Sequence, residues 1–286
     1  MPSHDRFLAL CAVLLLSGCG AAQPAPVPAA SSTPAVHESG PAPATPIPES
    51  ASAPAGIPGA TRTGARPPVV QHGPRDTPWV SLTFDADMTD AMAERLRSGK
   101  VSSYANVTLL KMLEQRRIPA TFFVTGQWAE EYPKITRRIA GNDLFEIANH
   151  SYEHAAFTAD CYTLPQLPPA TMTEDVAKTF TTLQPYGGRQ TRYFRFPGLC
   201  HDKPALKALA PLGLTVVDGD VVSGDPFAQG PAPIVRAVLS QVKPGSIIVM
   251  HVTEANAQYT DDALPKILAG LQRRGLRPVK LSELLG

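Results

Sequence analysis

The sequence predicts an α/β fold in which helices alternate with parallel strands and the strands form a barrel. Two observations lead to this prediction. From Trp79 to the end of the 286-residue chain, segments with strand character alternate with segments whose apolar residues recur at helical spacing, in about seven repeats. No Gly-x-Gly-x-x-Gly turn or phosphate-binding loop follows any of these strands, which disfavours a nucleotide-binding sheet. A barrel is therefore the favoured arrangement.

The predicted strands are short runs of apolar residues. The first alternates in apolar character, and the second is rich in β-branched and aromatic side chains. The sixth is apolar almost throughout, which is typical of a strand buried on both faces. In chain order, the predicted strands are residues 79–84, 121–125, 144–148, 192–196, 214–217, 246–250 and 277–281.

The predicted helices lie between these strands. The first stops before Pro119, and the second carries an expected irregularity at Pro133. Thr171 and Glu174 have the spacing of a capping box and are expected to open a helix that runs to Leu183. In chain order, the predicted helices are residues 107–118, 127–140, 171–183, 204–210, 233–242 and 262–274.

The N-terminal segment has the features of an export signal. Arg6 supplies a positive charge, and the apolar residues 7–16 that follow are too few to span a bilayer. Residues 16–19, Leu-Ser-Gly-Cys, resemble the bacterial lipobox, which would make Cys19 the lipidated first residue of the mature protein. The alternative is a plain secretory signal cleaved near Ala21 or Ala22. The first interpretation predicts an exported protein attached by its lipid to a bacterial membrane, on the periplasmic or outer surface.

Composition divides the rest of the chain into two parts. Residues 20–77 are rich in Ala, Pro and Ser and have few large apolar side chains, so we expect a disordered tether. Residues 78–286 are expected to form the folded domain. The chain has 26 Lys and Arg against 25 Asp and Glu, so no net field recruits nucleic acid or an anionic membrane. The lipid is then the only expected attachment to the membrane.

Two cysteines remain after Cys11 leaves with the signal and Cys19 takes the lipid. In an oxidising compartment, Cys161 and Cys200 are expected to form a disulfide. The alternatives are two buried free thiols, or a zinc ligand supplied by one of them.

Polar side chains follow several of the predicted strands, at the end where barrel enzymes carry their chemistry. His150 and His154 would share a face if a helical turn begins there, and neutral imidazole suits zinc and similar divalent ions. Capping or packing can explain each such residue alone, but not five strand ends together. The sequence therefore predicts a metal site at the strand ends. The residues at these ends are Asp85, Asp87, His150, His154, Arg195, Asp220, Asp225 and His251.

The order of these motifs resembles that of the polysaccharide deacetylases, carbohydrate esterase family 4. The residues that carry the resemblance are 83–87, 150–154, 195–198 and 249–251, and it extends from about Trp79 to Gly286. It implies a distorted (β/α)7-type barrel. It also implies a divalent metal cofactor, most often Zn²⁺, and an acetylated polysaccharide as substrate, with removal of N-acetyl groups from glucosamine polymers or O-acetyl groups from xylan.

The resemblance also implies a role for each residue. Asp85 would act as general base, and His251 would protonate the leaving nitrogen. Arg195 would hold Asp85 in position, and a backbone N–H near Gly198 or Leu199 would stabilise the oxyanion. The expected metal ligands are Asp87, His150 and His154.

This sequence departs from the family pattern in three places. Ala86 separates two aspartates that are usually adjacent. The segment 220–227 lacks the usual tryptophan, so it is open whether Asp220 or Asp225 orients His251. The arginine motif is short and is followed by Cys200, and with residues 88–103 this suggests a differently shaped groove.

These observations favour a lipid-anchored, metal-dependent enzyme that removes N-acetyl groups from an extracytoplasmic glycan, peptidoglycan or poly-N-acetylglucosamine. One alternative is an O-acetyl esterase acting on xylan or a wall sugar. Another is a wall-binding lipoprotein whose catalytic site has decayed.

Overall fold

Nine parallel strands form one curled sheet in the computed structural model, which describes residues 56–286. Eight of them follow the order β1-β6-β5-β4-β3-β2-β8-β7, and β9 pairs with the amino-terminal half of β2. The strands are β1 (Val69–Val70), β2 (Trp79–Ala86), β3 (Ala120–Val124), β4 (Phe145–Asn149), β5 (Gln190–Phe194), β6 (Thr215–Val217), β7 (Val221–Val222), β8 (Ile247–His251) and β9 (Arg277–Val279). The predicted lipidation at Cys19 and most of the predicted tether lie outside the described residues.

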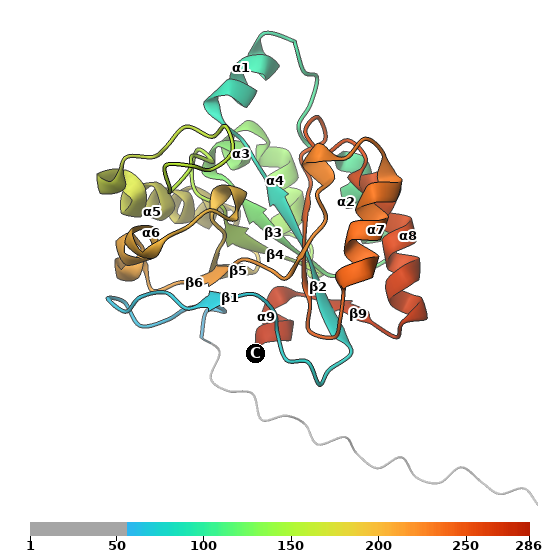
Figure 1. Ribbon diagram of the computed structural model, residues 1–286. Helices are drawn as coiled ribbons and strands as arrows, with labels where there is room; N and C mark the ends of the chain where they lie inside the picture. The colour runs from blue at the N-terminus through green and yellow to red at the C-terminus, as the bar shows by residue number, and fades with distance from the viewer. Residues whose placement is uncertain (1–55) are drawn as a thin grey trace, which may run out of the picture. The chain divides into compact units, whose positions relative to one another are not determined.

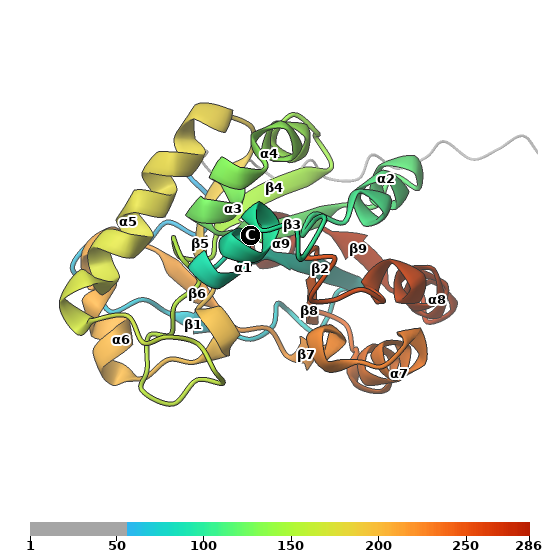
Figure 2. The ribbon, with the colours of Figure 1, turned by 90° about the horizontal axis from the view of Figure 1, so that it is seen from above.

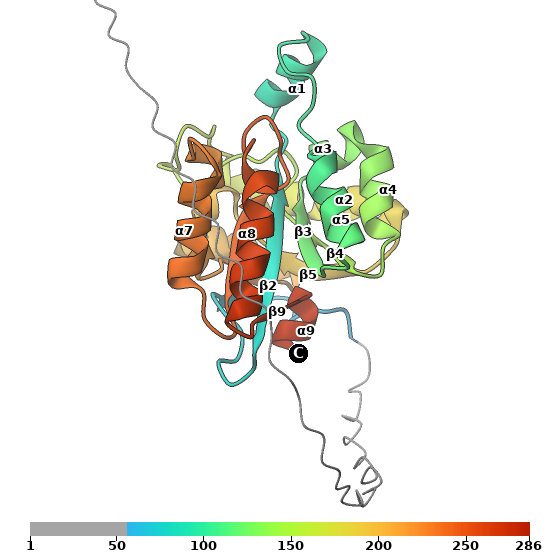
Figure 3. The ribbon, with the colours of Figure 1, turned by 90° about the vertical axis from the view of Figure 1, so that its right-hand side faces the viewer.

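Helices surround the curled sheet, as the view from above shows (Figures 1 and 2). α7 and α8 lie side by side outside β7, β8 and β2, and α5 and α6 lie outside β4, β5 and β6 on the other side of the barrel (Figures 2 and 3). The helices are α1 (Asp90–Arg97), α2 (Val107–Gln115), α3 (Gly126–Glu131), α4 (Pro133–Ala140), α5 (Met172–Leu183), α6 (Lys203–Ala208), α7 (Pro231–Gln241), α8 (Thr260–Arg273) and α9 (Leu281–Leu285). No described helix is both long and apolar enough to span a bilayer.

The central strand β2 divides its side chains between the two faces of the sheet. Val80, Leu82 and Phe84 belong to the large cluster that packs under the helices. Successive side chains of a strand point to opposite faces, so Thr83 and Asp85 point into the barrel. Both faces of β2 are buried beyond Trp79, although the strand alternates in apolar character.

The amino-terminal end of the barrel interior is filled by apolar side chains. Phe123, Tyr193 and Val217 form a buried cluster with Leu281 and Leu284 of the C-terminal helix α9. This packing leaves the carboxyl ends of the strands as the open end of the barrel, and polar residues gather there.

The barrel is incomplete, because no strand of the described chain pairs β1 with β7. Single contacts cross this gap instead. The Gly73 N–H donates to the Gly245 carbonyl at 2.8 Å, and the Arg75 guanidinium lies 2.7 Å from the Asp220 carboxylate. The prediction of an α/β barrel is confirmed in this curled, half-closed form.

The structure corrects three local predictions. Residues 56–77 were expected in the tether, but β1 pairs with β6 and Thr61 donates to the Leu214 carbonyl at 3.1 Å, so the folded part begins earlier than residue 78. The capping box does not form: the Thr171 side chain makes no capping hydrogen bond, and its hydroxyl donates to the Pro168 carbonyl at 2.9 Å. The segment 127–140 is two helices rather than one, and they meet at the irregularity expected at Pro133, which starts α4 after α3 has ended.

Candidate active site

Asp87, His150 and His154 bring three potential ligand atoms together at the open end of the barrel. One ligand atom from each lies within 4.8 Å of the other two. The Asp87 Oδ1 atom is 3.4 Å from the Nε2 atom of both histidines. The sequence thus anticipated which residues would meet here.

The loop after β4 brings His154 to the site without the helical turn expected from the sequence. Ser151 and His154 both adopt positive φ, 70° and 55°, which non-glycine residues rarely do. The Ser151 N–H donates to the Asn149 side chain at 2.9 Å, and the Ser151 hydroxyl accepts from the His154 N–H at 3.1 Å. These bonds hold a strained loop, a feature that clusters at functional sites.

The protonation states suit a divalent cation. The His150 Nδ1 atom lies 2.9 Å from the Arg195 carbonyl, which can only accept, so Nδ1 carries a hydrogen and Nε2 is the nitrogen that faces Asp87. Burial lowers the pKa of His154 to about 4, although the Asp87 carboxylate opposes this, so its imidazole is neutral at pH 7. Two imidazoles and a carboxylate are a set that zinc accepts.

Asp87 carries the charge of this cluster. Burial acts to raise its pKa, but the histidines around it, His154 and His251 foremost, are charged in the acidic range and hold the pKa well below its usual value. Its Oδ1 atom is buried and finds no hydrogen-bond donor in the described part of the chain. A buried carboxylate oxygen without a donor is costly, and a bound cation would satisfy it.

Asp85 lies beside this cluster and is held by Arg195. The Arg195 Nη1 atom donates to Asp85 Oδ1 at 2.6 Å, and both side chains are almost fully buried. The guanidinium is fixed further by the Val217 carbonyl at 3.1 Å and by the ring of Phe123, whose centroid is 4.0 Å away. The other oxygen of Asp85 lies 3.7 Å from His150 Nε2.

His251 approaches from the opposite side, on β8. Its Nδ1 atom lies 2.8 Å from Asp225 Oδ1, and its Nε2 atom lies 3.7 Å from Asp87 Oδ2. Burial would lower the pKa of His251, but the carboxylates, Asp225 before Asp87 and Asp85, raise it to about 10. The histidine is therefore protonated at neutral pH in the absence of a cation.

Comparison with known proteins decides the family. The sequence profile described as "Polysaccharide deacetylase" matches residues 72–217. The chain belongs to the polysaccharide deacetylase family. The predicted enzyme class is thereby confirmed at the level of the family, which includes enzymes that act on the acetyl amide bonds of sugars.

The relatives of this deacetylase agree with that assignment. A chitooligosaccharide deacetylase of Bradyrhizobium sp. is 29% identical over 188 residues, which span 62% of this chain and 82% of that protein. A peptidoglycan-N-acetylglucosamine deacetylase of Bacillus cereus is 31% identical over 182 residues, and the match spans 62% of each protein.

Solved structures show the same fold. A peptidoglycan N-acetylglucosamine deacetylase crystallised with an N-hydroxybenzamide ligand has a TM-score of 0.64 at 26% identity, covering 76% of this chain and 92% of its own. A family pseudoenzyme from Bacillus anthracis superposes with a TM-score of 0.61 at 22% identity, covering 77% of this chain and 69% of its own. At that identity the likeness concerns the fold alone.

Two residues predicted for the deacetylase site, Asp220 and Leu199, make other hydrogen bonds and do not take their predicted roles. Asp220 does not contact His251, because its carboxylate binds Arg75 and accepts from the Ile247 N–H at 2.9 Å. The Leu199 N–H donates to the Phe196 carbonyl at 2.9 Å, so it is not free for an oxyanion. Gly198 stays the predicted oxyanion donor.

The predicted disulfide is present. Cys161 and Cys200 are bonded, with their Cα atoms 5.9 Å apart. The disulfide joins the loop after the histidine motif to the loop after Arg195.

The sequence did not identify the hydroxyl residues that hydrogen-bond to Asp225 and Asp87 and fix them in place. Ser223 and Thr260 donate to the Asp225 carboxylate at 2.7 and 2.6 Å. The Thr253 hydroxyl accepts from the Asp87 N–H at 3.1 Å. Hydroxyl residues are too common for sequence to single these out, although Thr253 lies two residues after His251.

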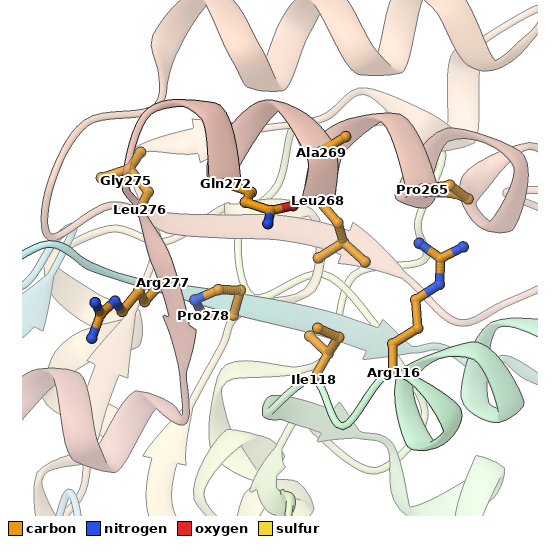
Figure 4. Close-up of a pocket in the computed structure, with 10 residues that line it drawn as sticks. All are labelled: Arg116, Ile118, Pro265, Leu268, Ala269, Gln272, Gly275, Leu276, Arg277 and Pro278. Carbon is orange, nitrogen blue, oxygen red and sulfur yellow. The ribbon is translucent and has the colours of Figure 1, made fainter. Parts of the chain in front are cut away.

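The pocket in Figure 4 is separate from the deacetylase site. It lies between α8, the end of α2 and β9, and Arg116, Leu268, Gln272 and Pro278 are among its lining residues. None of the catalytic candidates lines it.

Proposed function

We propose that this protein is a metal-dependent hydrolase that removes N-acetyl groups from an extracytoplasmic glycan, either peptidoglycan or poly-N-acetylglucosamine. The observation that carries the proposal is the convergence of three units: the cluster of Asp87 with two histidines, the Asp85–Arg195 pair and the Asp225–His251 pair. Together they offer the ligands, the base and the acid that amide hydrolysis needs.

Asp87, His150 and His154 would hold the divalent metal, with Zn²⁺ as the first candidate. A bound divalent ion supplies Lewis-acid polarisation of the acetyl carbonyl and makes water easier to deprotonate. The chain prepares the ligands itself, since the Arg195 carbonyl orients the His150 ring and burial keeps His154 neutral.

Asp85 is the proposed general base. Arg195 holds one of its oxygens, which leaves the other directed toward His150 and the cluster. That free oxygen can accept the proton of the attacking water. The same ion pair fixes the orientation of the Asp85 carboxylate.

His251 is the proposed general acid. Its Nδ1–H donates to Asp225, so the proton on Nε2 is the one that can be transferred. When the carbon–nitrogen bond breaks, the electron pair stays on nitrogen and takes this proton, so the amine leaves as a neutral group. The acetyl carbon keeps the oxygen of water, and acetate is the second product.

The substrate and the location rest on three observations. The relatives are named for chitooligosaccharide and peptidoglycan deacetylation. The disulfide suits an exported protein. The N-terminal signal with Cys19 predicts a lipid anchor that would hold the enzyme on a bacterial membrane within reach of the cell wall. Nucleic acid is not expected as a partner, because the net charge is only +1.

The test is acetate release from N-acetylglucosamine oligomers, before and after treatment with a chelator. We expect the chelator and Asp85→Asn each to abolish activity. Asp220→Asn is the matched control, because it removes a carboxylate that also follows a strand but binds Arg75 instead. Activity that persists after both treatments would refute the proposed mechanism.

The same assay separates the alternatives. Release from acetylated xylan with none from the oligomers would favour an O-acetyl esterase. Glycan binding without a stoichiometric metal, and without hydrolysis of either substrate, would show a decayed site.

A further inference from the structure

Tyr162 and Phe227 form an exposed pair of aromatic rings. Each side chain is 71% exposed, and the rings stack with their centroids 5.8 Å apart at an interplanar angle of 22°. Among the large hydrophobic residues exposed in the described chain, the only other aromatic one is Trp79. It lies at the amino-terminal end of β2, whereas Asp85 of the site lies near the carboxyl end. Two rings paired in water keep apolar area exposed, and such patches mark binding sites.

The pair lies at the rim of the proposed catalytic site. Phe227 is two residues past Asp225, the partner of His251. The Tyr162 ring lies over Gly198, three residues past Arg195, since a Cβ atom on that glycine would come within 3.0 Å of the ring. The rings therefore bridge the two loops that carry the proposed acid and the arginine that holds the base.

The backbone holds Tyr162 in an unfavourable conformation. Its φ is 52°, a value that is a genuine outlier for a bulky residue. The neighbouring disulfide ties its loop to Cys200, and the Cys161 sulfur also lies 3.5 Å from the Pro197 carbonyl. Strain that the surroundings maintain at a site rim is consistent with a side chain placed for binding.

We propose that Tyr162 and Phe227 form a stacking platform for one sugar ring of the polymer, beside the residue whose acetyl group is removed. Aromatic faces carry negative charge density, and the C–H bonds along one face of a pyranose carry partial positive charge. Two rings match a single sugar, whereas a stable protein partner would need about 800 Å² on this surface. The proposal rests on the proposed function, because the glycan must reach the site along this rim.

The test compares a polymer substrate with one that has no sugar. We expect Tyr162→Ala and Phe227→Ala to lower the ratio of kcat/KM for the N-acetylglucosamine pentamer to that for 4-nitrophenyl acetate about tenfold, equivalent to 1.4 kcal/mol of binding. The change should appear in KM for the pentamer rather than in kcat. Tyr162→Phe and Phe227→Tyr keep the rings and should restore most of the ratio.

Trp79→Ala is the matched control, because it removes an exposed aromatic at the other end of the barrel and should leave the ratio unchanged. Thermal unfolding checks that each variant is folded. A pentamer KM that both alanine variants leave unchanged would overturn the platform.

Direct binding separates this proposal from the proposed function. If the wild-type protein hydrolyses neither substrate, the proposed function fails, and calorimetric titration with the pentamer then tests the platform alone. Binding that both alanine variants weaken about tenfold supports the platform. Binding that they leave unchanged, or no binding by the wild type, overturns it.

Discussion

Asp175 should make the stability of the domain depend on pH in an unusual direction. This carboxylate lies on α5, is only 8% exposed, and accepts from the Tyr152 N–H at 2.9 Å in the loop that carries the two histidines. Burial raises its pKa from 3.8 to about 6, with the Tyr152 N–H opposing and Glu153 adding to the rise. A difference of about 2 pH units corresponds to about 3 kcal/mol.

The direction in which stability changes with pH follows from whether Asp175 loses its proton first in the folded or in the unfolded chain. Below about pH 4 the carboxyl is protonated in both states, and the folded chain bears no cost for a buried charge. Between about pH 4 and pH 6 the unfolded chain ionises first, so the free energy of unfolding falls as the pH rises. Asp175→Asn removes this titration and keeps an oxygen that can accept from Tyr152.

Urea unfolding of both proteins, with the disulfide intact and metal removed by a chelator, measures the effect. The stability of Asp175→Asn relative to the parent should increase by about 2 to 3 kcal/mol between pH 4 and pH 8. Glu94→Gln is the control, because this carboxylate is exposed. The difference in unfolding free energy between Glu94→Gln and the parent should hardly change with pH. If the difference in unfolding free energy between Asp175→Asn and the parent is the same at pH 4 and pH 8, the reasoning is refuted.

Three further predictions concern the site and its loops. Arg195→Met leaves the buried Asp85 charge unpaired and should lower the free energy of unfolding by about 3 to 5 kcal/mol, and adding Asp85→Asn should restore part of it in urea titrations. Replacing both Cys161 and Cys200 by Ser frees a loop of 39 residues and should lower the free energy of unfolding by about 4 kcal/mol. An unchanged unfolding midpoint would show that the crosslink does not stabilise the fold. His251→Ala should slow amide hydrolysis about 100- to 10,000-fold and ester hydrolysis less, so equal losses on both substrates would argue against its role as acid.

The sequence predicted the fold where local pattern and burial agree. The segments around β2, β3 and β8 have enough apolar and β-branched residues to identify them without tertiary information. β1 and β7 contain two residues each and exist only because a neighbouring strand supplies their partners. Residues 56–77 looked disordered by composition, yet they bind β5 and β6 from far away in sequence.

The site shows the same division between pattern and tertiary contact. The strand ends gave the right residues for the cluster, because parallel strands bring their carboxyl ends to one edge. The choice between Asp220 and Asp225 could not be made, since both follow β6 and only the path through β7 brings Asp225 to His251. The route to His154 was also hidden, because left-handed backbone at Ser151 leaves no clear sequence signal.

The central claim is that Asp87, His150 and His154 hold one divalent cation. Metal analysis of protein purified without added ions tests this directly. We predict about one ion per chain, lost when His150 and His154 are both replaced by Ala. His201→Ala removes a half-buried histidine that binds Asp218 instead, and this control should keep the ion. A wild-type protein without metal, or an ion retained by the double variant, would contradict the account.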